Sequence, residues 1–352
     1  FGSSILPAQA KLKLIICLPV DASRTSSLTF PSIARAPSGL AAPRAVSNSN
    51  SSSSNNNNTI NKNMAAEASS VYAARGSRFT DKVVIVTGAA GNFGSVGVKM
   101  LAAEGAKVAL VDLRKDKVEE LADEVERDYG VKCRPFGVDI TKEEQVKNMV
   151  DEVVAEFGRI DCLFNNAGYQ GLFSPVDDYD VEDFDRVFKI NVTGVFCLLK
   201  YCSKVMVEQK GGSIVNTASC AGLGCPTMMP AYASSKAAVQ HLTKISAVDL
   251  APSKIRVNSV SPAFIGPEEG FMWRRQVELQ AQANPTNAPE WYFSDDPDKV
   301  AEQMLNSIPL RRLGKVEEVI KTVMFLLSDE ASYITGIDIN VSGGNVLGGS
   351  RG

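Results

Sequence analysis

Residues 83–94 read Val-Val-Ile-Val-Thr-Gly-Ala-Ala-Gly-Asn-Phe-Gly, and this stretch decides the fold. Its first five residues are apolar or β-branched and predict a buried strand. A glycine-rich turn follows at once, and residues 95–105 (SVGVKMLAAEG) then predict a helix. Such a turn lets the backbone approach a pyrophosphate, while the free N–H groups and positive dipole end of the helix face it. A glycine cluster alone also suits an ordinary tight turn, so its context decides.

That context is a carboxylate at the end of the next strand. Residues 107–111 (KVALV) predict the strand, and Asp112 follows it, 18 residues after Gly94. A carboxylate at this distance accepts hydrogen bonds from the adenosine ribose of NAD. It repels the 2′-phosphate of NADP, because two like charges ~4 Å apart cost about 1 kcal/mol in water and ~4 kcal/mol near a protein surface. NAD is therefore favoured, and NADP is the alternative because Arg114 is close enough to turn towards a 2′-phosphate.

Short β-branched runs alternate with helical stretches from Asp81 to about Gly348. The further runs are Cys162–Phe164, Ser213–Thr217, Arg256–Val260 and Ile337–Val341. Near-continuous apolar strands suit a parallel sheet that is covered on both faces. The sequence therefore predicts a single doubly wound α/β (Rossmann) domain over residues 79–348, with a central parallel sheet and helices on both faces.

The stretch that begins at Thr141 shows the helical pattern most clearly. Thr141-Lys-Glu-Glu144 is a capping-box signature. Apolar residues then recur at helical spacing and predict one stripe that docks on the sheet: Val146, Met149, Val150, Val153, Val154 and Phe157.

Residues 1–78 differ from the rest of the chain. Residues 47–63 are rich in Ser and Asn and bury too little apolar area to offset their ordering entropy. Upstream, Asp21 is the only acidic residue among several Lys and Arg, which is typical of an organelle transit peptide. The alternative is a non-native segment, because Met64 also opens a plausible chain. We expect an organelle location in the first case and a cytoplasmic one in the second; residues 349–352 are expected to be a tail.

The composition argues against several classes of partner. The net charge is −3, whereas nucleic acids and anionic membranes attract clustered cations. No uninterrupted apolar run approaches the roughly 18 residues of a membrane-spanning helix. The 7 cysteines lack a CxxC pair and His241 is the only histidine, so we expect reduced thiols and no metal site.

Taken together, the motifs resemble those of the short-chain dehydrogenase/reductase family over about Thr80 to Gly348. Residues 87–94 are similar to the family's TGxxxGxG turn, with Asn92 in place of the middle glycine. Asparagine adopts left-handed backbone angles more easily than most residues, so we expect the turn to survive. Residues 165–168 (NNAG) and the pair Asp139-Ile140 also match family motifs.

The resemblance implies four catalytic residues, namely Asn191, Ser219, Tyr232 and Lys236. Tyr232 exchanges the proton of the substrate hydroxyl group. Lys236, one helical turn on, lowers the Tyr232 pKa from its usual value of about 10 and hydrogen-bonds the nicotinamide ribose. Ser219 holds the reacting oxygen, and Asn191 supports a water that relays protons past Lys236. A Tyr-x-x-x-Lys pair alone is common on helices, but Ser219 lies 13 residues before Tyr232, which is the family spacing.

The resemblance also implies the cofactor contacts and the assembly. The cofactor contacts are Gly88, Asn92, Phe93, Gly94, Asp112, Asp139, Ile140, Asn166, Ala167, Gly168, Tyr232, Lys236 and Pro262. Ala263 follows Pro262 where the family usually has glycine, which would tighten the nicotinamide pocket. A homotetramer or homodimer is implied because the helices that carry Asn191 and Tyr232 commonly pack against partner subunits in this family.

Within the family, three segments are most similar to NAD-dependent xylitol dehydrogenases: residues 165–171, 271–280 and 292–314. A polyol substrate is implied by this likeness alone. The candidate substrate contacts are Ser219, Gln170 and Met272, and an amide such as Gln170 marks hydroxyl groups. Trp273 suits either the pocket or a lid core. Residues 266–304 interrupt the strand–helix rhythm and predict a substrate lid, with a rigid helical pair as the alternative.

The leading hypothesis is NAD-dependent interconversion of a secondary alcohol, such as xylitol or a related polyol, and its ketone by hydride transfer. One alternative is a carbonyl or 3-oxoacyl reductase of the same family, against which Gln170 and the polar lid argue. The other alternative is a non-catalytic NAD-binding sensor, which would not need the four catalytic residues.

Overall fold

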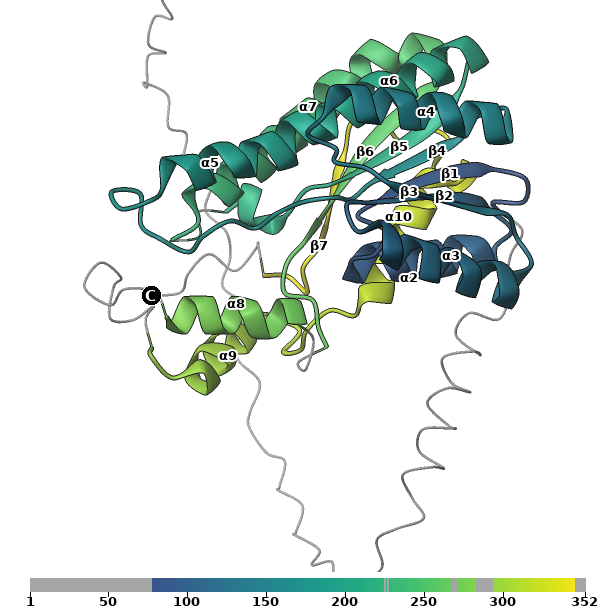
Figure 1. The fold of residues 1–352 in the computed structure, drawn as a ribbon. Coiled ribbons are helices and arrows are strands. Elements are labelled where there is room, and N and C mark those ends of the chain that lie inside the picture. Colours follow the sequence, from purple (N-terminus) through teal and green to yellow (C-terminus); the bar gives the residue numbers. More distant parts are fainter. Residues whose placement is uncertain (1–77, 225, 227, 268–270, 283–293, 346–352) are drawn as a thin grey trace, which may run out of the picture. The chain divides into compact units, whose positions relative to one another are not determined.

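Seven parallel strands form one sheet in the order β3-β2-β1-β4-β5-β6-β7 (Figure 1). The structure is a computed structural model and describes residues 78–224, 226, 228–267, 271–282 and 294–345. The strands are β1 (Val83–Thr87), β2 (Lys107–Asp112), β3 (Cys133–Gly137), β4 (Cys162–Asn165), β5 (Gly212–Thr217), β6 (Ile255–Pro262) and β7 (Asp338–Val341). Each pairing between them is parallel. The predicted doubly wound α/β fold is therefore confirmed, while the N-terminal segment before residue 78 and the C-terminal tail lie outside the described residues.

All the predicted apolar runs form strands, and the strand that no apolar run marked is β3. It reads Cys-Arg-Pro-Phe-Gly, and only its first and fourth residues are buried. The strand lies at the edge of the sheet and pairs with β2. An edge strand tolerates Pro135 because one side of an edge strand needs no ladder hydrogen bonds. An edge position thus explains why the apolar pattern is missing here.

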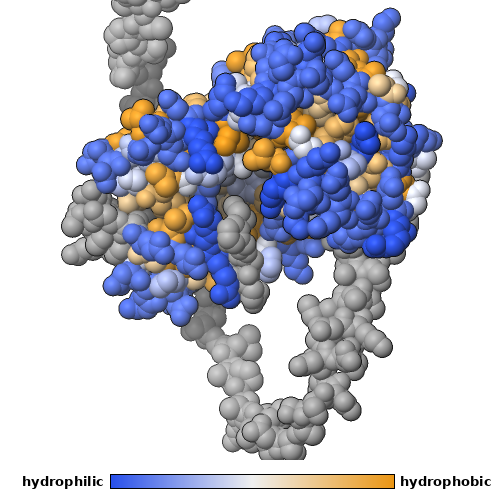
Figure 2. All heavy atoms as spheres, viewed as in Figure 1, coloured by the Kyte–Doolittle hydropathy of each residue, from blue (hydrophilic) through white to orange (hydrophobic). Residues whose placement is uncertain are grey.

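Two layers of helices cover the sheet (Figure 1). One apolar core joins the sheet to α2 (Asn92–Ala103), α3 (Lys115–Tyr129) and α10 (Val316–Leu327). The other joins it to α4 (Glu143–Phe157), α6 (Val195–Gln209) and α7 (Pro230–Leu250). Side chains of β1 alternate between the two cores, with Val84 in the first and Ile85 in the second. Figure 2 shows mostly hydrophilic residues on the outward sides of α3 and α4.

The helix α4 confirms the predicted apolar stripe but not the predicted cap. The residues of the stripe are buried or packed against the core: Val146, Met149, Val150, Val153, Val154 and Phe157. The helix begins at Glu143, and among the described residues no side chain caps it. The capping-box prediction at Thr141 is therefore wrong. The Thr141 hydroxyl and N–H donate instead to Asp139 Oδ1, at 2.7 and 2.9 Å, so the signature residue closes a turn ahead of the helix.

The longest helical stretch, Val181–Gln209, is a helix of the core. It consists of α5 (Val181–Phe188), the π-helical turn η1 (Lys189–Gly194) and α6. It is long and apolar enough to cross a membrane by length and composition, with a mean hydropathy of 1.3 in its most apolar window. Its apolar residues Val195, Leu198 and Met206, however, pack in the core beneath the sheet. The packing therefore accounts for its apolar character.

Two helices after β6 have a small core of their own. They are α8 (Phe271–Ala281) and α9 (Pro297–Asn306), within the segment predicted as a lid. The residues that they bury together are Trp273, Val277, Ala281, Val300 and Met304. Phe264, just after β6, meets Trp273 edge to face with ring centroids 5.9 Å apart. The two helices therefore form a separate packing unit that contacts the strand end through Phe264.

The turn between β1 and α2 has no room for a side chain at Gly94. A Cβ atom there would lie 2.0 Å from the carbonyl oxygen of Gly88 and 2.7 Å from the Cα of Ala89. The left-handed backbone falls on Gly88, with φ of +63°, whereas Asn92 is the first residue of the right-handed helix α2. The expected left-handed Asn92 is therefore wrong. Asparagine is tolerated because a helical residue has no need of glycine at this position.

We predict that Gly94→Ala destabilises the protein by about 1–3 kcal/mol, because the added methyl group would overlap backbone atoms rather than movable side chains. Urea unfolding of the cofactor-free protein measures this loss. The control is Gly211→Ala, since the nearest atom to a Cβ at Gly211 is 4.0 Å away. Equal stability of the two variants would contradict the prediction.

Candidate active site

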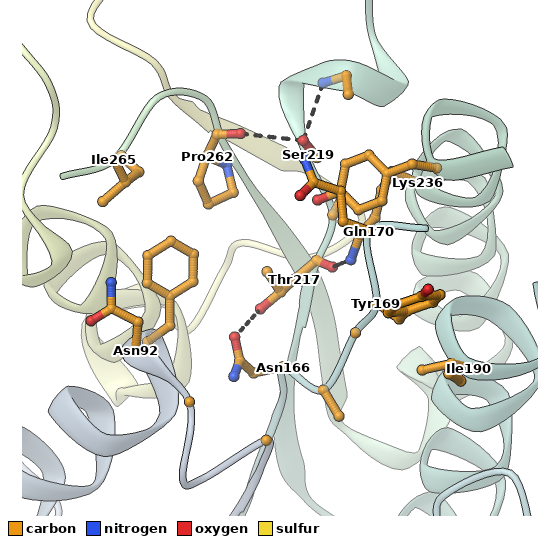
Figure 3. Close-up of a pocket in the computed structure, with 18 of the residues that line it drawn as sticks. Asn92, Asn166, Tyr169, Gln170, Ile190, Thr217, Ser219, Lys236, Pro262 and Ile265 are labelled. Carbon is orange, nitrogen blue, oxygen red and sulfur yellow. Dashed lines mark hydrogen bonds between the residues drawn. The ribbon is translucent and has the colours of Figure 1, made fainter. Parts of the chain in front are cut away.

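A cavity of about 960 Å³ opens at the carboxyl ends of the strands, where the order of the sheet reverses. The chain runs outward from β1 to β2 and β3 and then returns to β4 on the other side of β1, so the loops after β1 and β4 leave in opposite directions. Nucleotides bind in this crevice of open α/β sheets. Figure 3 shows Gln170, Ser219 and Lys236 on one side of the pocket and Asn92 on the other.

The cavity brings together nearly all the residues proposed to contact the cofactor. Those that line it are Gly88, Asn92, Phe93, Asp112, Asp139, Ile140, Asn166, Ala167, Gly168, Tyr232, Lys236 and Pro262. Gly94 is not among the residues that line the cavity and acts through the close packing of α2 on the turn. The N-cap of α2 is Gly91, and within the described part of the chain no side chain accepts from the first N–H groups of the helix. These N–H groups suit a pyrophosphate.

Asp112 is held in place by backbone and side-chain donors. Its Oδ2 accepts from Ala90 N at 3.0 Å, and its Oδ1 accepts from Arg114 N at 3.1 Å and from Arg114 Nε at 3.2 Å. The carboxylate is buried, while the guanidinium is mostly exposed. Arg114 is therefore turned to Asp112, and the carboxylate is fixed at the cavity wall where a ribose would lie.

The side chain of Asn166 joins the ends of three neighbouring strands. Its Nδ2 donates to the carbonyl oxygen of Thr87 at 3.1 Å, and its Oδ1 accepts from Thr217 Oγ1 at 3.2 Å (Figure 3). Its backbone N–H donates to Thr87 Oγ1 at 2.9 Å. Asn166 thus fixes the floor of the cavity between β1, β4 and β5.

Tyr232 and Lys236 lie one turn apart on α7 and both face the cavity. The Lys236 ammonium donates to the carbonyl oxygen of Thr217 at 2.8 Å and lies 5.7 Å from the centre of the Tyr232 ring. Ser219 follows β5 and lines the same cavity, and its Oγ donates to the carbonyl oxygen of Pro262 at 3.5 Å (Figure 3). The serine, tyrosine and lysine are thus gathered at one place, from two elements far apart in sequence.

The pKa of Tyr232 departs from the sequence-based expectation. Burial raises the pKa of Tyr232, and the nearby Ser219 side chain only partly opposes this rise. Burial also lowers the pKa of Lys236 to about 8. The expected lowering of the Tyr232 pKa by Lys236 is therefore wrong for the cofactor-free protein, because the loss of water around the phenol disfavours the phenolate.

Hydrogen bonds behind Ser219 hold its backbone. Gln240 Nε2 donates to the carbonyl oxygen of Ser219 at 3.1 Å and to Ser261 Oγ at 2.9 Å. Ser261 Oγ donates in turn to the Asp338 carboxylate at 2.8 Å. The sequence did not point to Gln240 or Asp338, which are 98 residues apart. The one available signal was that Gln240 lies four residues after Lys236, on the same face of α7.

The side chain of Asn191 is engaged with Tyr169 rather than open to the cavity. Its Oδ1 accepts from Tyr169 N at 2.7 Å, and its Nδ2 donates to Tyr169 O at 2.8 Å and to Ser235 Oγ at 3.0 Å. Asn191 lies in η1, and π-helical turns are frequent at functional sites. Its amide therefore fixes the backbone just before Gln170, and a role in proton relay stays a prediction.

Amides and an indole line part of the cavity wall. Trp273, Gln276 and Gln280 line it from one face of α8, at positions i, i+3 and i+7. Gln170 lines it as well, and its Oε1 is buried without a hydrogen-bond partner in the described structure. Trp273 thus serves both the pocket and the lid core. The side chain of Met272 lies outside the described residues, and Gln276 and Gln280 were missed because surface helices often carry such amides.

Two other reactive residues in the described part of the chain, His241 and Cys220, are poor candidates for the cavity chemistry. His241 is exposed on α7. Burial raises the pKa of the Cys220 thiol to about 12, so the thiolate is disfavoured, and Cys225 lies outside the described residues. Among the residues that the structure describes, there is no group of three or more His, Cys, Asp or Glu that could hold a metal ion.

The chain belongs to the short-chain dehydrogenase/reductase family. Residues 82–275 match the family model described as short chain dehydrogenase, and residues 281–345 match one described as enoyl-(acyl carrier protein) reductase. It is accordingly an oxidoreductase that uses a nicotinamide cofactor and acts on a small molecule.

Its similarity to solved and curated members is extensive. The crystal structure of an NAD⁺-bound xylitol dehydrogenase is 49% identical, with a TM-score of 0.72, and the match covers 76% of this chain and 99% of that one. Levodione reductase from Leifsonia aquatica is 36% identical over 76% of this chain and 95% of the relative. A 3-oxoacyl-[acyl-carrier-protein] reductase from Thermotoga maritima is 37% identical over 77% of this chain and 100% of the relative. The resemblance to xylitol dehydrogenase is therefore confirmed.

We predict that the buried Lys236 makes stability depend on pH. Its pKa is about 8 in the folded protein, against an ordinary value of 10.5 for a lysine in water. Below pH 8 Lys236 is protonated in both the folded and the unfolded protein, and burial of its charge lowers the free energy of unfolding by about 3 kcal/mol. This cost disappears as pH rises from about 8 to 10.5, because the folded protein then holds the lysine neutral. Lys236→Met should therefore stabilise the cofactor-free protein relative to wild type more at pH 7 than at pH 10, by urea unfolding. Lys244→Met, at an exposed position of α7, is the control, and the same difference at both pH values would count against the prediction.

Proposed function

We propose that this protein is an NAD-dependent polyol dehydrogenase, which interconverts a secondary alcohol of a sugar alcohol such as xylitol and the corresponding ketone. The observation that carries the proposal is the buried, unpartnered Oε1 of Gln170, on the side of the pocket that holds Ser219 and Lys236, within the described residues. A buried acceptor is costly unless a ligand donates to it. A neighbouring hydroxyl group of a polyol is such a donor, and the 49% identity with a xylitol dehydrogenase supports the same class.

The residues at the cavity divide the chemistry between them. Bound oxidised nicotinamide supplies the hydride acceptor. Tyr232 takes the proton of the substrate hydroxyl group, and Ser219 holds the same oxygen by a hydrogen bond. Lys236 stands beside Tyr232 and is anchored on Thr217, so its ammonium is placed to favour the phenolate and to donate to a ribose hydroxyl group. Asn191 sets the wall of this site through Tyr169.

The buried Asp112 supports NAD over NADP. Its carboxylate would accept from the ribose hydroxyl groups, and a 2′-phosphate would meet a like charge at the same place. Arg114 Nε donates to Asp112, so the guanidinium is held beside the carboxylate. The cofactor preference is therefore a consequence of one fixed carboxylate.

A carbonyl or 3-oxoacyl reductase is the second candidate, since two relatives carry names of that kind. A carbonyl group beside the reacting carbon can accept from Gln170 Nε2 but offers no donor to the buried Oε1, and an acceptor left unpaired costs about 1–3 kcal/mol. Gln276 and Gln280 add further amides to the cavity wall. A non-catalytic sensor is disfavoured because it gains nothing from the grouping of Ser219, Tyr232 and Lys236.

We further propose a homo-oligomer and a lid. Apolar residues lie exposed on α6 and α7, with Phe196 and Ile245 each 48% and Val248 74% exposed, and a partner subunit would cover them. The packing unit of α8 and α9 lines the cavity through Trp273 and contacts the strand end through Phe264. It is therefore suited to close over a substrate as one body.

We predict NADH formation with polyols. Turnover should be poorer with secondary alcohols that carry a single hydroxyl group, and with cyclic ketones and 3-oxoacyl thioesters assayed in the reverse direction.

Tyr232→Phe should lower kcat by about 10²–10⁴-fold, because it removes the proton acceptor, and should leave the Kd for NAD within a few-fold. Spectrophotometry at 340 nm over the panel measures turnover, and fluorescence quenching measures NAD binding. Turnover of acyl thioesters alone would favour the second candidate, and tight NAD binding without any turnover would favour the sensor.

We predict that Asp112→Ser shifts the preference from NAD towards NADP by about 10- to 100-fold in kcat/KM, because it removes a charge-assisted acceptor and releases Arg114. Steady-state kinetics with both cofactors at fixed polyol concentration measure the shift. The double variant Asp112→Ser/Arg114→Gln should lose the gain with NADP. A double variant that keeps this gain would show that Arg114 has no part in it.

A further inference from the structure

We propose that Asp183 is the positioning residue for Gln170, and that it thereby restricts the enzyme to substrates with a hydroxyl group beside the reacting carbon. The proposal rests on the function proposed above and names the device that selects its substrates. Asp183 lies in the first turn of α5, where its backbone N–H donates to the Asp180 cap at 2.7 Å. It does not line the cavity.

The Asp183 carboxylate gathers three donors from the segment that carries Gln170. Its Oδ2 accepts from Leu172 N at 2.9 Å and from the Tyr179 hydroxyl at 2.8 Å, and its Oδ1 accepts from the Tyr169 hydroxyl at 3.1 Å. The Tyr179 oxygen also accepts from Leu172 N at 3.2 Å. Tyr169 and Leu172 flank Gln170 on either side, so one carboxylate holds the chain both before and after it.

A second clamp acts on the same segment. Asn191 binds both the N–H and the carbonyl oxygen of Tyr169, at 2.7 and 2.8 Å. The Arg186 guanidinium lies over the Tyr169 ring, 4.8 Å from its centre. The backbone of Tyr169 is therefore fixed by Asn191 while its ring is fixed by Asp183 and Arg186. The backbone at Gln170 is therefore held on both sides, which fixes the position from which its side chain enters the cavity.

The turn after Gln170 packs too closely on its neighbours to admit a side chain at Gly171. Gly171 has φ of +74°, and a Cβ atom there would lie 2.6 Å from Val187 Cγ2, 2.7 Å from the Tyr179 hydroxyl and 2.8 Å from Asp183 Oδ2. The segment is thus pressed directly onto the carboxylate and its tyrosine. A displacement of Asp183 would be transmitted to Gln170 through contacts that are already close.

This rigidity matters because Gln170 is proposed to discriminate hydroxyl groups from carbonyl and methylene groups. A glutamine side chain in a mobile segment would swing into water and satisfy its own acceptor, and it would then tolerate a carbonyl or a methylene group in the cavity equally well. A glutamine that is held with a buried, unpartnered Oε1 requires a donor from the ligand. Hydroxyl groups donate, whereas carbonyl and methylene groups do not. Discrimination between polyols and simple alcohols or diketones therefore depends on Asp183, which touches none of them.

The experiment compares Asp183→Asn with the matched variant Asp185→Asn, whose aspartate is exposed on the same helix. For each, kcat/KM is measured with xylitol and with cyclopentanol, which has no neighbouring hydroxyl group. Asp183→Asn should lower the xylitol-to-cyclopentanol ratio by about 5- to 50-fold, mainly through the KM for xylitol, with kcat for cyclopentanol within two-fold. Asp185→Asn should leave the ratio unchanged.

The double variant with Gln170→Leu separates positioning from a general loss of structure. If Asp183 acts through Gln170, adding Asp183→Asn to Gln170→Leu should not lower the ratio further. If Asp183→Asn fails to fold, by melting temperature and NAD binding, Tyr179→Phe replaces it, because it removes one donor to the same carboxylate. An unchanged ratio in the folded variant, or equal losses with and without Gln170, would overturn the proposal. A wild-type enzyme without polyol activity would instead overturn the proposed function.

Discussion

The parallel pairing of β1 with β4 is the constraint on which the site depends. The chain builds the sheet outward in one direction through β2 and β3, and it must then return to the other side of β1. The loops that follow the two central strands therefore part, and a crevice opens between them. The glycine turn, Asp112 and Asn166 all reach this crevice because each directly follows a strand that ends there. The position of the binding site is thus a consequence of strand order, and the loops supply the residues that line it.

Burial shifts the pKa values of the two titrating groups at the site and makes the charged lysine costly. The same loss of water that raises the Tyr232 pKa lowers that of Lys236 to about 8. An ammonium group removed from water is unfavourable unless a partner compensates, and the carbonyl oxygen of Thr217 does so only in part. The cofactor-free protein therefore holds its lysine in a strained electrostatic state. Polar groups that a ligand brings into the cavity would relieve this strain.

The cavity wall at Gln170 shows how a fold that many enzymes share can be made selective for one class of substrate. The Ser219, Tyr232 and Lys236 group and the glycine turn explain why the chain belongs to its family, whose members differ in substrate. Gln170, by contrast, is held between Asn191 and Asp183, which lie on one continuous helical stretch. Asp183 on that stretch thus supports Gln170, the candidate substrate contact, although Asp183 does not itself line the cavity. Selectivity can therefore change through a few supporting residues while the machinery for proton transfer stays constant.

The sequence by itself determined the strands with apolar runs, the glycine turn, Asp112 and the spacing of Ser219 to Tyr232, because these depend on local composition and on short separations along the chain. It did not mark β3, since an edge strand with Pro135 carries no apolar run, and it misjudged the cap at Thr141, whose partner Asp139 lies before the helix. Only the tertiary structure decided the direction of the Tyr232 pKa, the engagement of Asn191 with Tyr169, and the links from Gln240 to Ser219 and from Asp183 to Leu172. The physical reason is that burial and hydrogen-bond partners arise from packing between distant segments, and the local pattern of residues does not record which segments meet.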